Sequence, residues 1–196
     1  MKMNRDKIKN YITYSWYIIL LVCIFSYTLS YYVVSSLTKY KKEEVFSIFV
    51  TSYELKDREL EKKLLNKYHE LGIEQVNIYN YLYEDKDIAS YYANFGKKSD
   101  IVILYEPDLN EMKEYIKDNF ICISISGYET YDYDGKAYAI KIYDSNSNEN
   151  YLYNYFEFQG DIKCSAYLLI NIDSVHFSSK EDLGYLIIND LLWGNI

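Results

Sequence analysis

The sequence predicts an α/β protein: a single three-layer domain with a mostly parallel sheet flanked by helices, supplemented by antiparallel hairpin strands and preceded by one N-terminal transmembrane helix. Three observations lead to this prediction. Residues 11–38 contain no charged residue, strand and helix patterns alternate over residues 45–125, and mainly strand patterns follow until a last helix. Alternating strands and helices are typical of a parallel sheet covered by helices. No repeat and no Pro-rich linker divides the part after the apolar run, so we expect one domain there.

The composition restricts the classes of function. The chain has 196 residues, a formal net charge of -8, 26 tyrosines, one proline and three cysteines. A net negative charge argues against nucleic acid as a partner, because its phosphates would be repelled. Three cysteines are too few for a multi-disulfide scaffold or a four-thiolate zinc site. We therefore expect no cofactor, no metal and no nucleic acid.

The apolar run is long enough to anchor the chain in the cell membrane. About 20 helical residues cross the hydrocarbon core, and we predict the anchor over residues 11–37. Aromatic residues near both ends of the run suit the two membrane interfaces. A cleaved signal peptide is the competing interpretation, but no Ala-x-Ala site follows the run. A lipoprotein would need a small residue before its cysteine, whereas Val22 precedes Cys23.

The flanking charges favour a cytoplasmic N-terminus by a small margin. Residues 1–10 carry four basic residues and one acidic residue, and three lysines follow the run between residues 39 and 42. The positive-inside rule then places residues 1–10 in the cytoplasm. In this interpretation residues 38–44 are a charged juxtamembrane linker. Residues 45–196, which are acidic overall, form an extracytoplasmic α/β domain.

Strands alternate with helices in the first half of this domain. Asp57 is predicted to cap the first helix, and Gly72 to end it with left-handed backbone. Asp108 and Glu111 resemble a capping box at the start of the third helix. The predicted strands cover residues 45–51, 73–81, 100–105 and 120–125, and the predicted helices cover residues 57–71, 88–95 and 109–117.

The second half is predicted to contain hairpins. Asp134-Gly135 is a strong turn signal, and residues 144–150 read as a polar loop between two strands. Ser178 or Ser179 is predicted to cap the last helix. The predicted elements are strands over residues 136–143, 151–158 and 165–172, and a helix that runs through residue 191.

No catalytic motif is present in the sequence. The chain has no Gly-x-Ser-x-Gly, no phosphate-binding glycine loop and no His-Glu-x-x-His. Its two histidines are His69, late in a helix, and His176, in the segment Asp173-Ser174-Val175-His176. The acid, hydroxyl and imidazole of that segment belong to one strand-to-helix connection and cannot readily converge as a triad. We expect no enzymatic activity.

Two acidic segments have the residue types of a calcium site without its pattern. The loop 144–150 has oxygen ligands at alternate positions, but Glu149 replaces the sixth-position glycine and Tyr155 replaces the twelfth-position glutamate. A solvated hairpin loop is the better interpretation. Asp132 and Asp134 have the same interpretation, because they flank a turn.

The cysteines and tyrosines leave alternatives open. Cys122 and Cys164 lie in predicted strands, where they form a disulfide in an oxidising exterior or remain free, buried thiols. Cys23 lies within lipid and is expected to be inert. The tyrosines cluster after the second strand and in the hairpins, where such side chains can stack on sugars or peptides or form an interface. Filling of strand surfaces is the simpler explanation for most of them.

Four short stretches resemble the first lobe of the extracellular solute-binding proteins of ABC importers. The passage Asp134-Gly135-Lys136-Ala137-Tyr138 is similar to a recurring Asp-Gly-Lys-x-Tyr passage near that family's hinge, with Ala139 and Lys141 in place of its Gly and Pro. The resemblance implies an α/β lobe that contacts a solute. It departs from the family in offering no residues for a second lobe and an apolar helix in place of a lipidated cysteine. The similar stretches are residues 46–54, 99–107, 134–140 and 167–174.

The leading hypothesis is therefore a membrane-anchored, non-enzymatic, solute-binding-like domain. The alternative is a structural or interaction subunit that meets a membrane-protein partner through its Tyr-rich surface. In open α/β sheets, ligands bind at the carboxyl ends of the strands. The ligand-binding residues predicted at that edge are Ser52, Tyr53, Glu54, Tyr81, Tyr105 and Glu106.

Overall fold

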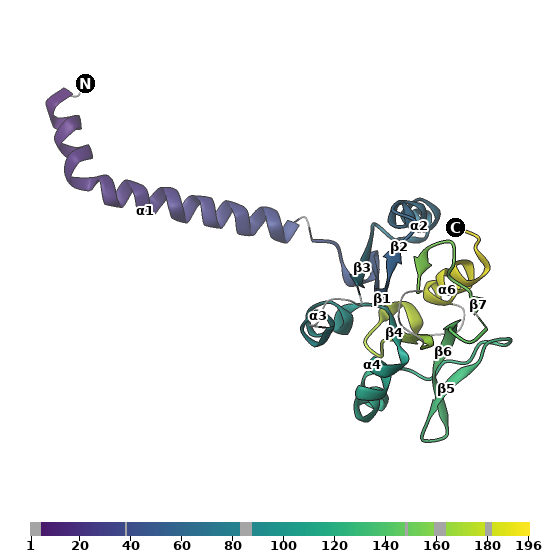
Figure 1. The fold of residues 1–196 in the computed structure, drawn as a ribbon. Coiled ribbons are helices and arrows are strands. Elements are labelled where there is room, and N and C mark those ends of the chain that lie inside the picture. The colour runs from purple at the N-terminus through teal and green to yellow at the C-terminus, as the bar shows by residue number, and fades with distance from the viewer. Residues whose placement is uncertain (1–4, 38, 83–87, 148, 159–163, 179–181) are drawn as a thin grey trace. The chain divides into compact units, whose positions relative to one another are not determined.

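The chain divides into two compact units, Met1–Tyr40 and Lys41–Ile196. The computed structural model (Figure 1) describes residues 5–37, 39–82, 88–147, 149–158, 164–178 and 182–196.

The first unit is a single long helix, α1 (Arg5–Leu37). Its segment Trp16–Val34 has a mean hydropathy of 2.0 and is long and apolar enough to cross a membrane or to act as a signal anchor. Every side chain of that segment is exposed. The hydroxyl of Thr28 donates to the carbonyl of Phe25 at 2.9 Å, which satisfies a polar group within the apolar segment.

The second unit is built on a seven-stranded mixed sheet, which confirms the predicted α/β class. The strand order is β3-β1-β4-β9-β6-β5, and the short β7 pairs with β6. Strand β1 is parallel to both β3 and β4, whereas β9, β6, β5 and β7 are antiparallel to their neighbours. The strands are β1 (Val45–Ser52), β3 (Gln75–Leu82), β4 (Ile101–Tyr105), β5 (Thr130–Tyr133), β6 (Lys136–Asp144), β7 (Glu149–Asn150) and β9 (Ala166–Ile170).

Two further strands form a separate antiparallel ladder, β2 (Glu54–Leu55) with β8 (Phe156–Glu157). Helices join and cover the strands of the main sheet (Figure 1). The α-helices are α2 (Leu60–Tyr68), α3 (Ile88–Asn94), α4 (Glu106–Glu111), α5 (Ile116–Asn119) and α6 (Leu183–Trp193). The 3-10 helices are η1 (Lys42–Glu44), η2 (His69–Leu71), η3 (Gly96–Lys98), η4 (Lys113–Tyr115) and η5 (Val175–Phe177).

The main sheet is buried on both faces, because alternate residues of its central strands enter two different cores. In β4, Ile101, Ile103 and Tyr105 belong to the first core, and Val102 and Leu104 belong to the second. The first core includes side chains of α2 and α6, and the second includes side chains of α3, α4 and α5. This two-sided burial explains why the central strands are almost continuous apolar runs.

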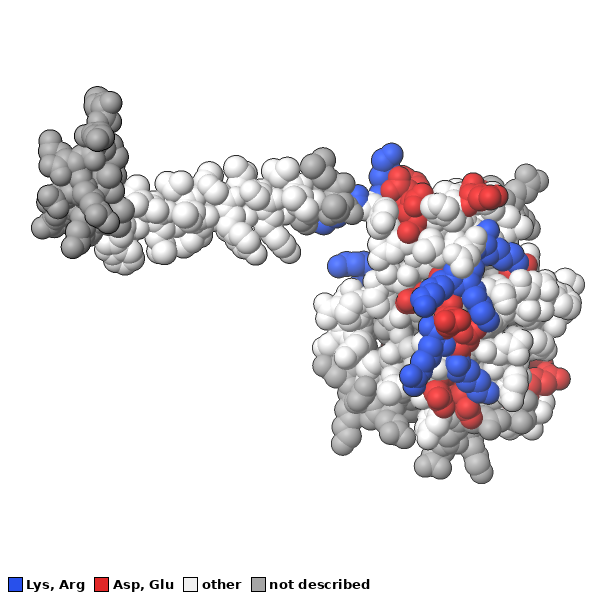
Figure 2. All heavy atoms as spheres, turned by 90° about the horizontal axis from the view of Figure 1, so that it is seen from above, with Lys and Arg blue, Asp and Glu red and all other residues white. Residues whose placement is uncertain are grey.

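Charged side chains of both signs are interleaved on the face of the second unit that Figure 2 shows. Helix α2 contributes several of them. Its Lys63 pairs with Asp57 at 2.8 Å, and its Lys67 pairs with Asp190 at 2.6 Å. This face therefore has no broad region of a single charge.

The hairpin prediction at Asp134-Gly135 is confirmed. Both residues have positive φ, 53° and 74°, in the turn between β5 and β6. Two central residues with positive φ define the turn whose twist matches that of antiparallel strands. Gly72 also has the predicted left-handed backbone, with φ 98°, after α2 and η2.

Three predicted caps are wrong. Asp57 accepts the N–H of Glu59 at 2.9 Å in the turn before α2, and the residue at the cap is Glu59. Helix α4 begins at Glu106 with proline in its first turn, where the missing N–H removes no hydrogen bond. Asp108 therefore lies inside the helix and does not cap it. The last helix is preceded by Asp182 rather than by Ser178; Ser179 lies outside the described residues.

Two predicted strands are also wrong in whole or in part. In residues 120–125 only Phe120 forms a bridge, to Asn171, because β9 occupies the position beside β4 that a fourth parallel strand would take. In residues 151–158 only β8 is extended, since residues 151–155 form turns. The side chain of Asn150 stabilises those turns by accepting the N–H of Leu152 at 3.0 Å.

Candidate functional site

The predicted ligand-binding residues at the strand ends divide between the two cores and the surface. Tyr81 is buried in the second core, whereas Tyr105 is fully buried in the first core, on the opposite face of the sheet. The hydroxyl of Tyr105 donates to the carbonyl of Phe158 at 2.8 Å. Ser52 is also buried, and its hydroxyl donates to Asn80 at 2.5 Å. The structure does not bring these three side chains to one surface.

Of the other three predicted residues, Tyr53 and Glu54 lie at a short ladder that follows β1 directly. The N–H of Tyr53 donates to the carbonyl of Glu157 at 2.8 Å, and Glu54 pairs with the same residue. The side chains of Tyr53 and Glu54 are exposed. Glu106 is half-buried in the first turn of α4, and its N–H donates to Ser165 at 2.9 Å. The backbone at the end of β1 is therefore paired with the chain's own β8.

A cavity of about 290 Å³ opens instead on the second-core face of the sheet, between α3 and the α4–α5 segment. Leu104 of β4 contributes to its wall from the sheet, and alanines of α3 face Met112 at the end of α4. Most of the wall is apolar or aromatic. The lining residues are Ala89, Tyr92, Ala93, Lys97, Leu104, Asp108, Glu111, Met112, Tyr115 and Asn119.

Two residues of this wall each have one polar atom that is enclosed by protein and has no hydrogen-bond partner among the described residues: the hydroxyl of Tyr92 and Oδ2 of Asp108. Tyr92 is only 8 % exposed. Burial raises the pKa of Tyr92 to about 12. Burial, with the negative charge of Glu111 as a second cause, raises the pKa of Asp108 to about 6. An unsatisfied buried polar group costs about 1–3 kcal/mol, so each of the two atoms lowers the stability of the folded domain.

Local sequence explains how each group reaches the cavity. Gly96 is required beneath the ring of Tyr92, because a Cβ atom there would lie 2.2 Å from Cδ2 of that ring. The ring also packs edge-on against Phe49 of β1, with centroids 6.0 Å apart. Helix α4 begins at Glu106, immediately after β4, with Pro107 in its first turn, and this early start places Asp108 in the first turn beside the sheet.

Charged and polar side chains surround the mouth of the cavity. Lys97, Glu111 and Tyr115 are exposed, and Asn119 is half-buried. The amide of Asn119 donates to the carbonyl of Tyr115 at 2.7 Å, which ties η4 to the end of α5. The site thus combines a largely apolar interior with a rim that carries both signs of charge.

The hydroxyl of Ser174 and the imidazole of His176 make structural contacts, whereas Asp173 is exposed. Asp100 accepts the hydroxyl of Ser174 at 2.5 Å and the N–H of Ser47 at 2.8 Å. His176 is buried, and its Nε2 lies 3.0 Å from the carbonyl of Val45. The imidazole of His176 therefore contacts backbone rather than the hydroxyl of Ser174.

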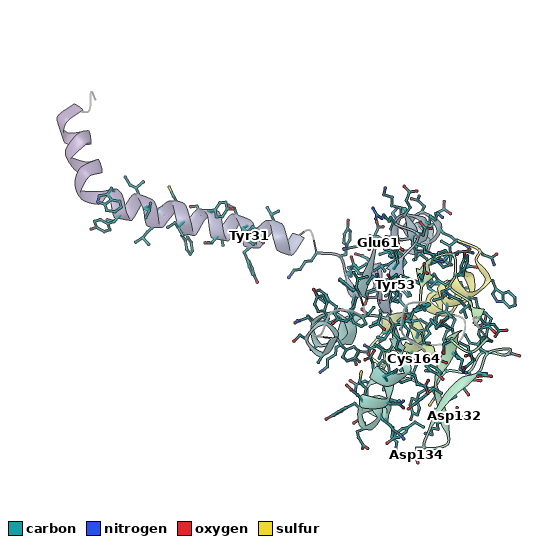
Figure 3. The ribbon with its side chains drawn as sticks, viewed as in Figure 1. Tyr31, Tyr53, Glu61, Asp132, Asp134 and Cys164 are labelled. Carbon is teal, nitrogen blue, oxygen red and sulfur yellow. The ribbon has the colours of Figure 1, made fainter. Side chains whose placement is uncertain are left out.

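No group of three or more potential metal ligands is found among the described residues. Asp144 accepts the N–H of Asn146 at 2.8 Å, as in a polar turn. Asp132 and Asp134 lie on the β5–β6 hairpin, apart from Tyr53 and Cys164 (Figure 3). Asp134 pairs with Lys117 at 2.5 Å.

The cysteines are free thiols in this structure. Cys122 is exposed on the extended segment that was predicted as a strand, and Cys164 is half-buried just before β9. Burial raises the pKa of the Cys164 thiol to about 11, which makes it a poor nucleophile at neutral pH.

Sequence reasoning missed Tyr92 and Asp108 as a pair. Tyr92 was one tyrosine of a cluster, and Asp108 was interpreted as a helix cap. One available signal was the position of Asp108, a carboxylate directly after an apolar strand and a proline. The partner could not be found in the same way, because 15 residues separate the two along the chain. No protein-family model, no curated protein and no solved structure matches this chain.

Proposed function

We propose that this chain is a membrane-anchored domain that binds a small solute in the cavity between α3 and α4 and catalyses no reaction. The observation that carries the proposal is a cavity of about 290 Å³ with a largely apolar wall, to which Tyr92 and Asp108 contribute. A concave apolar site with a few convergent polar groups and a perturbed pKa is the usual form of a ligand site.

The proposal uses the resemblance to solute-binding lobes for the fold alone. It includes a three-layer domain over residues 45–196, supported by the two cores on opposite faces of the sheet. It moves the solute site away from the strand ends, where Ser52, Tyr81 and Tyr105 are buried and β8 pairs with the chain after β1.

The binding proposal is tested by filling the cavity. Full-length protein in nanodiscs of neutral phosphatidylcholine is titrated with 2-phenylethanol and phenethylamine, and binding is followed by saturation-transfer NMR. We expect both probes to bind, and Ala93→Trp to weaken binding at least tenfold because the indole occupies the space between α3 and Met112.

The matched control is Asn94→Trp, which adds the same side chain at an exposed position of α3 outside the cavity wall. This variant should bind both probes as the wild type does. Failure of both probes to bind the wild type, or equal binding by Ala93→Trp, would contradict the proposal.

We also propose that residues 45–196 lie outside the cell. The support is the excess of basic residues before the apolar segment, four against the three that follow it closely. Protease added to intact protoplasts should digest the domain and leave a small membrane-bound fragment that includes α1. A domain that resists protease until the membrane is lysed would place it in the cytoplasm.

Exposed aromatic side chains favour a second candidate, an interaction subunit of a membrane complex. Tyr153 and Trp193 are 64 % and 71 % exposed. They belong to neighbouring segments, since a Cβ atom on Gly194 would lie 3.1 Å from the amide of Asn154. This candidate requires that alanine at positions 153 and 193 releases a stoichiometric partner, while Ala93→Trp retains it.

A further inference from the structure

We propose that the edge of the sheet at which β1 and β4 begin binds the headgroups of anionic phospholipids in the membrane that holds α1. We call this surface the lysine edge; it consists of Lys42, Lys97, Lys98, Ile172 and Val175. The inference rests on the membrane anchoring in the proposed function. It does not require that a solute binds, and it holds for either side of the membrane.

Three segments that are far apart in the sequence meet at this edge. The 3-10 helix η1 leads into β1, and η3 leads into β4. Because β1 and β4 are parallel, both 3-10 helices lie at the same edge of the sheet. Strand β9 is antiparallel to β4 and ends there, since Ile170 pairs with Ile101. Residues 172–175 follow β9 and complete the edge.

Hydrogen bonds hold the three segments together. The amine of Lys42 donates to the carbonyl of Asp173 at 2.8 Å. The amide of Asn171 donates to the carbonyl of Lys97 at 2.9 Å. A cavity of about 160 Å³ is lined by Lys42, Lys97 and Lys98 together with Asp173. The three lysines therefore belong to one surface.

These lysines are available to phosphate groups. All three are exposed, and none forms an ion pair with a carboxylate among the described residues. An ammonium has three N–H groups, so Lys42 can donate to a phosphate in addition to the carbonyl of Asp173. Lysine binds phosphate as a compact point charge.

Apolar side chains accompany the lysines. Ile172 and Val175 are 49 % and 37 % exposed, and they flank Asp173 and Ser174 in the chain. Membrane-surface segments combine basic side chains, which meet the phosphates, with apolar side chains, which enter the boundary between headgroups and acyl chains. The composition of the lysine edge fits a lipid surface better than free phosphate, which has no apolar part.

The chain keeps this edge close to the membrane. Lys42 is the fifth residue after Leu37, the last residue of α1. Five extended residues span at most about 18 Å, and a headgroup layer is about 5–8 Å thick. Within this short connection Lys39 is a fourth exposed lysine, and Lys41 pairs with Glu44 at 3.9 Å. Lys42 therefore stays within reach of the headgroups.

Acidic side chains reduce the attraction without cancelling it. Asp100 lines the same cavity, but it is buried and accepts the hydroxyl of Ser174. Asp173 and Glu43 are exposed. Four lysines, with Lys39 included, against these three carboxylates leave an excess of one positive charge in a domain that is acidic overall. An anionic membrane therefore attracts this edge and repels the rest of the domain.

The test measures how fast each lysine of the full-length protein is methylated by formaldehyde and dimethylamine borane. Both reagents are uncharged, so an anionic membrane does not deplete them. The protein is compared in nanodiscs of phosphatidylcholine and in nanodiscs that also contain phosphatidylglycerol, and mass spectrometry gives the rate at each lysine.

We expect Lys42, Lys97 and Lys98 to react about fivefold more slowly beside phosphatidylglycerol, because a lysine that is bound to a phosphate stays protonated and shielded. This factor corresponds to one lysine near an anionic surface. Lys62, whose side chain is 76 % exposed on α2, should react equally fast in both lipids.

The double variant Lys97→Glu with Lys98→Glu tests whether the edge itself binds. Reversal of two charges removes the attraction, so Lys42 of this variant should react equally fast in both lipids. The matched control is Arg58→Glu with Lys62→Glu, which makes the same change in charge at exposed positions in and just before α2. That control should retain the slow reaction of the lysine edge.

The outcomes separate this inference from the others. Equal rates for Lys97 and Lys98 in the two lipids would overturn it and leave the anchoring and the solute site intact. Slow reaction of Lys42 that persists in the Lys97→Glu, Lys98→Glu protein would also overturn it, because nearness to the membrane alone would then explain the rate. Failure of the protein to remain with the nanodiscs would overturn the anchoring and this inference together.

Discussion

Truncation of Tyr105 to alanine is expected to lower the free energy of unfolding by about 3–5 kcal/mol, as for other large buried aromatic side chains. Tyr105 is fully buried in the first core at the end of β4. Its ring packs edge-on against Phe158, with centroids 6.0 Å apart, and its hydroxyl donates to the carbonyl of the same residue. The substitution removes the ring, leaves a cavity and removes the hydrogen bond to the carbonyl of Phe158.

Urea denaturation of the full-length protein in detergent, followed by near-UV circular dichroism, measures this loss. Tyr105→Phe separates the hydroxyl from the ring and should cost about 1 kcal/mol. Tyr53→Ala is the matched control, because Tyr53 was predicted for the same edge of the sheet but is 46 % exposed. A Tyr105→Ala protein as stable as Tyr53→Ala would contradict the assignment of Tyr105 to the core.

Replacement of Asp108 by asparagine is expected to stabilise the protein at neutral pH by about 1–2 kcal/mol. The pKa of this carboxyl is raised from 3.8 to about 6 in the folded protein, so the folded state disfavours the ionised form. Each pKa unit corresponds to about 1.4 kcal/mol. We expect about half of the full effect, because part of the carboxyl remains in contact with water.

The sign of the pH dependence follows from the raised pKa. Below about pH 4 the carboxyl is protonated in both the folded and the unfolded state, and the destabilisation is absent. Between about pH 4 and pH 6 the unfolded state ionises first, so wild-type stability falls as the pH rises. Above about pH 7 the destabilisation is complete. The stabilisation by Asp108→Asn should therefore be small near pH 4 and full at pH 7–8.

Thermal unfolding of full-length wild type and variant between pH 4 and pH 8 checks this expectation. Other charged and titratable groups near Asp108 are Glu111, Glu106, Lys97 and Cys164, and they are the same in both proteins. Asp118→Asn, at an exposed position of α5, should change stability little at any pH. A stability difference between wild type and Asp108→Asn that does not vary with pH would show that Asp108 is hydrated as an ordinary surface carboxylate.

Functional sites often contain groups that lower the free energy of unfolding of the protein. A carboxylate in the cavity wall that destabilises the domain fits that pattern.

The features that the sequence by itself determined are those that depend on near neighbours along the chain. The apolar segment of α1 follows from composition alone, since no partner is needed to make residues 16–34 long and apolar enough for a membrane. The turn at Asp134-Gly135 follows from the positive φ that these residue types tolerate. The parallel trio β3-β1-β4 follows from strands joined by helices, which return the chain in the same direction.

The tertiary structure alone decided which strand lies beside β4. Residues 120–125 have the composition of a strand, but β9 pairs with β4 along all five of its residues, from Ile101 with Ile170 to Tyr105 with Ala166. More than one extended apolar segment can occupy a given position in the sheet. Packing against the whole core, rather than local propensity, determines which segment pairs there. This pairing makes the sheet mixed.

The tertiary structure also decided where a ligand could bind. Tyr81 and Tyr105 were predicted for one edge, but successive side chains of a strand point to opposite faces, and the register placed these two in different cores. Tyr92 and Asp108 are brought to one cavity by the space at Gly96 and by the early start of α4 at Glu106. No local pattern encodes such a meeting, because it depends on how two helices pack against the same strand.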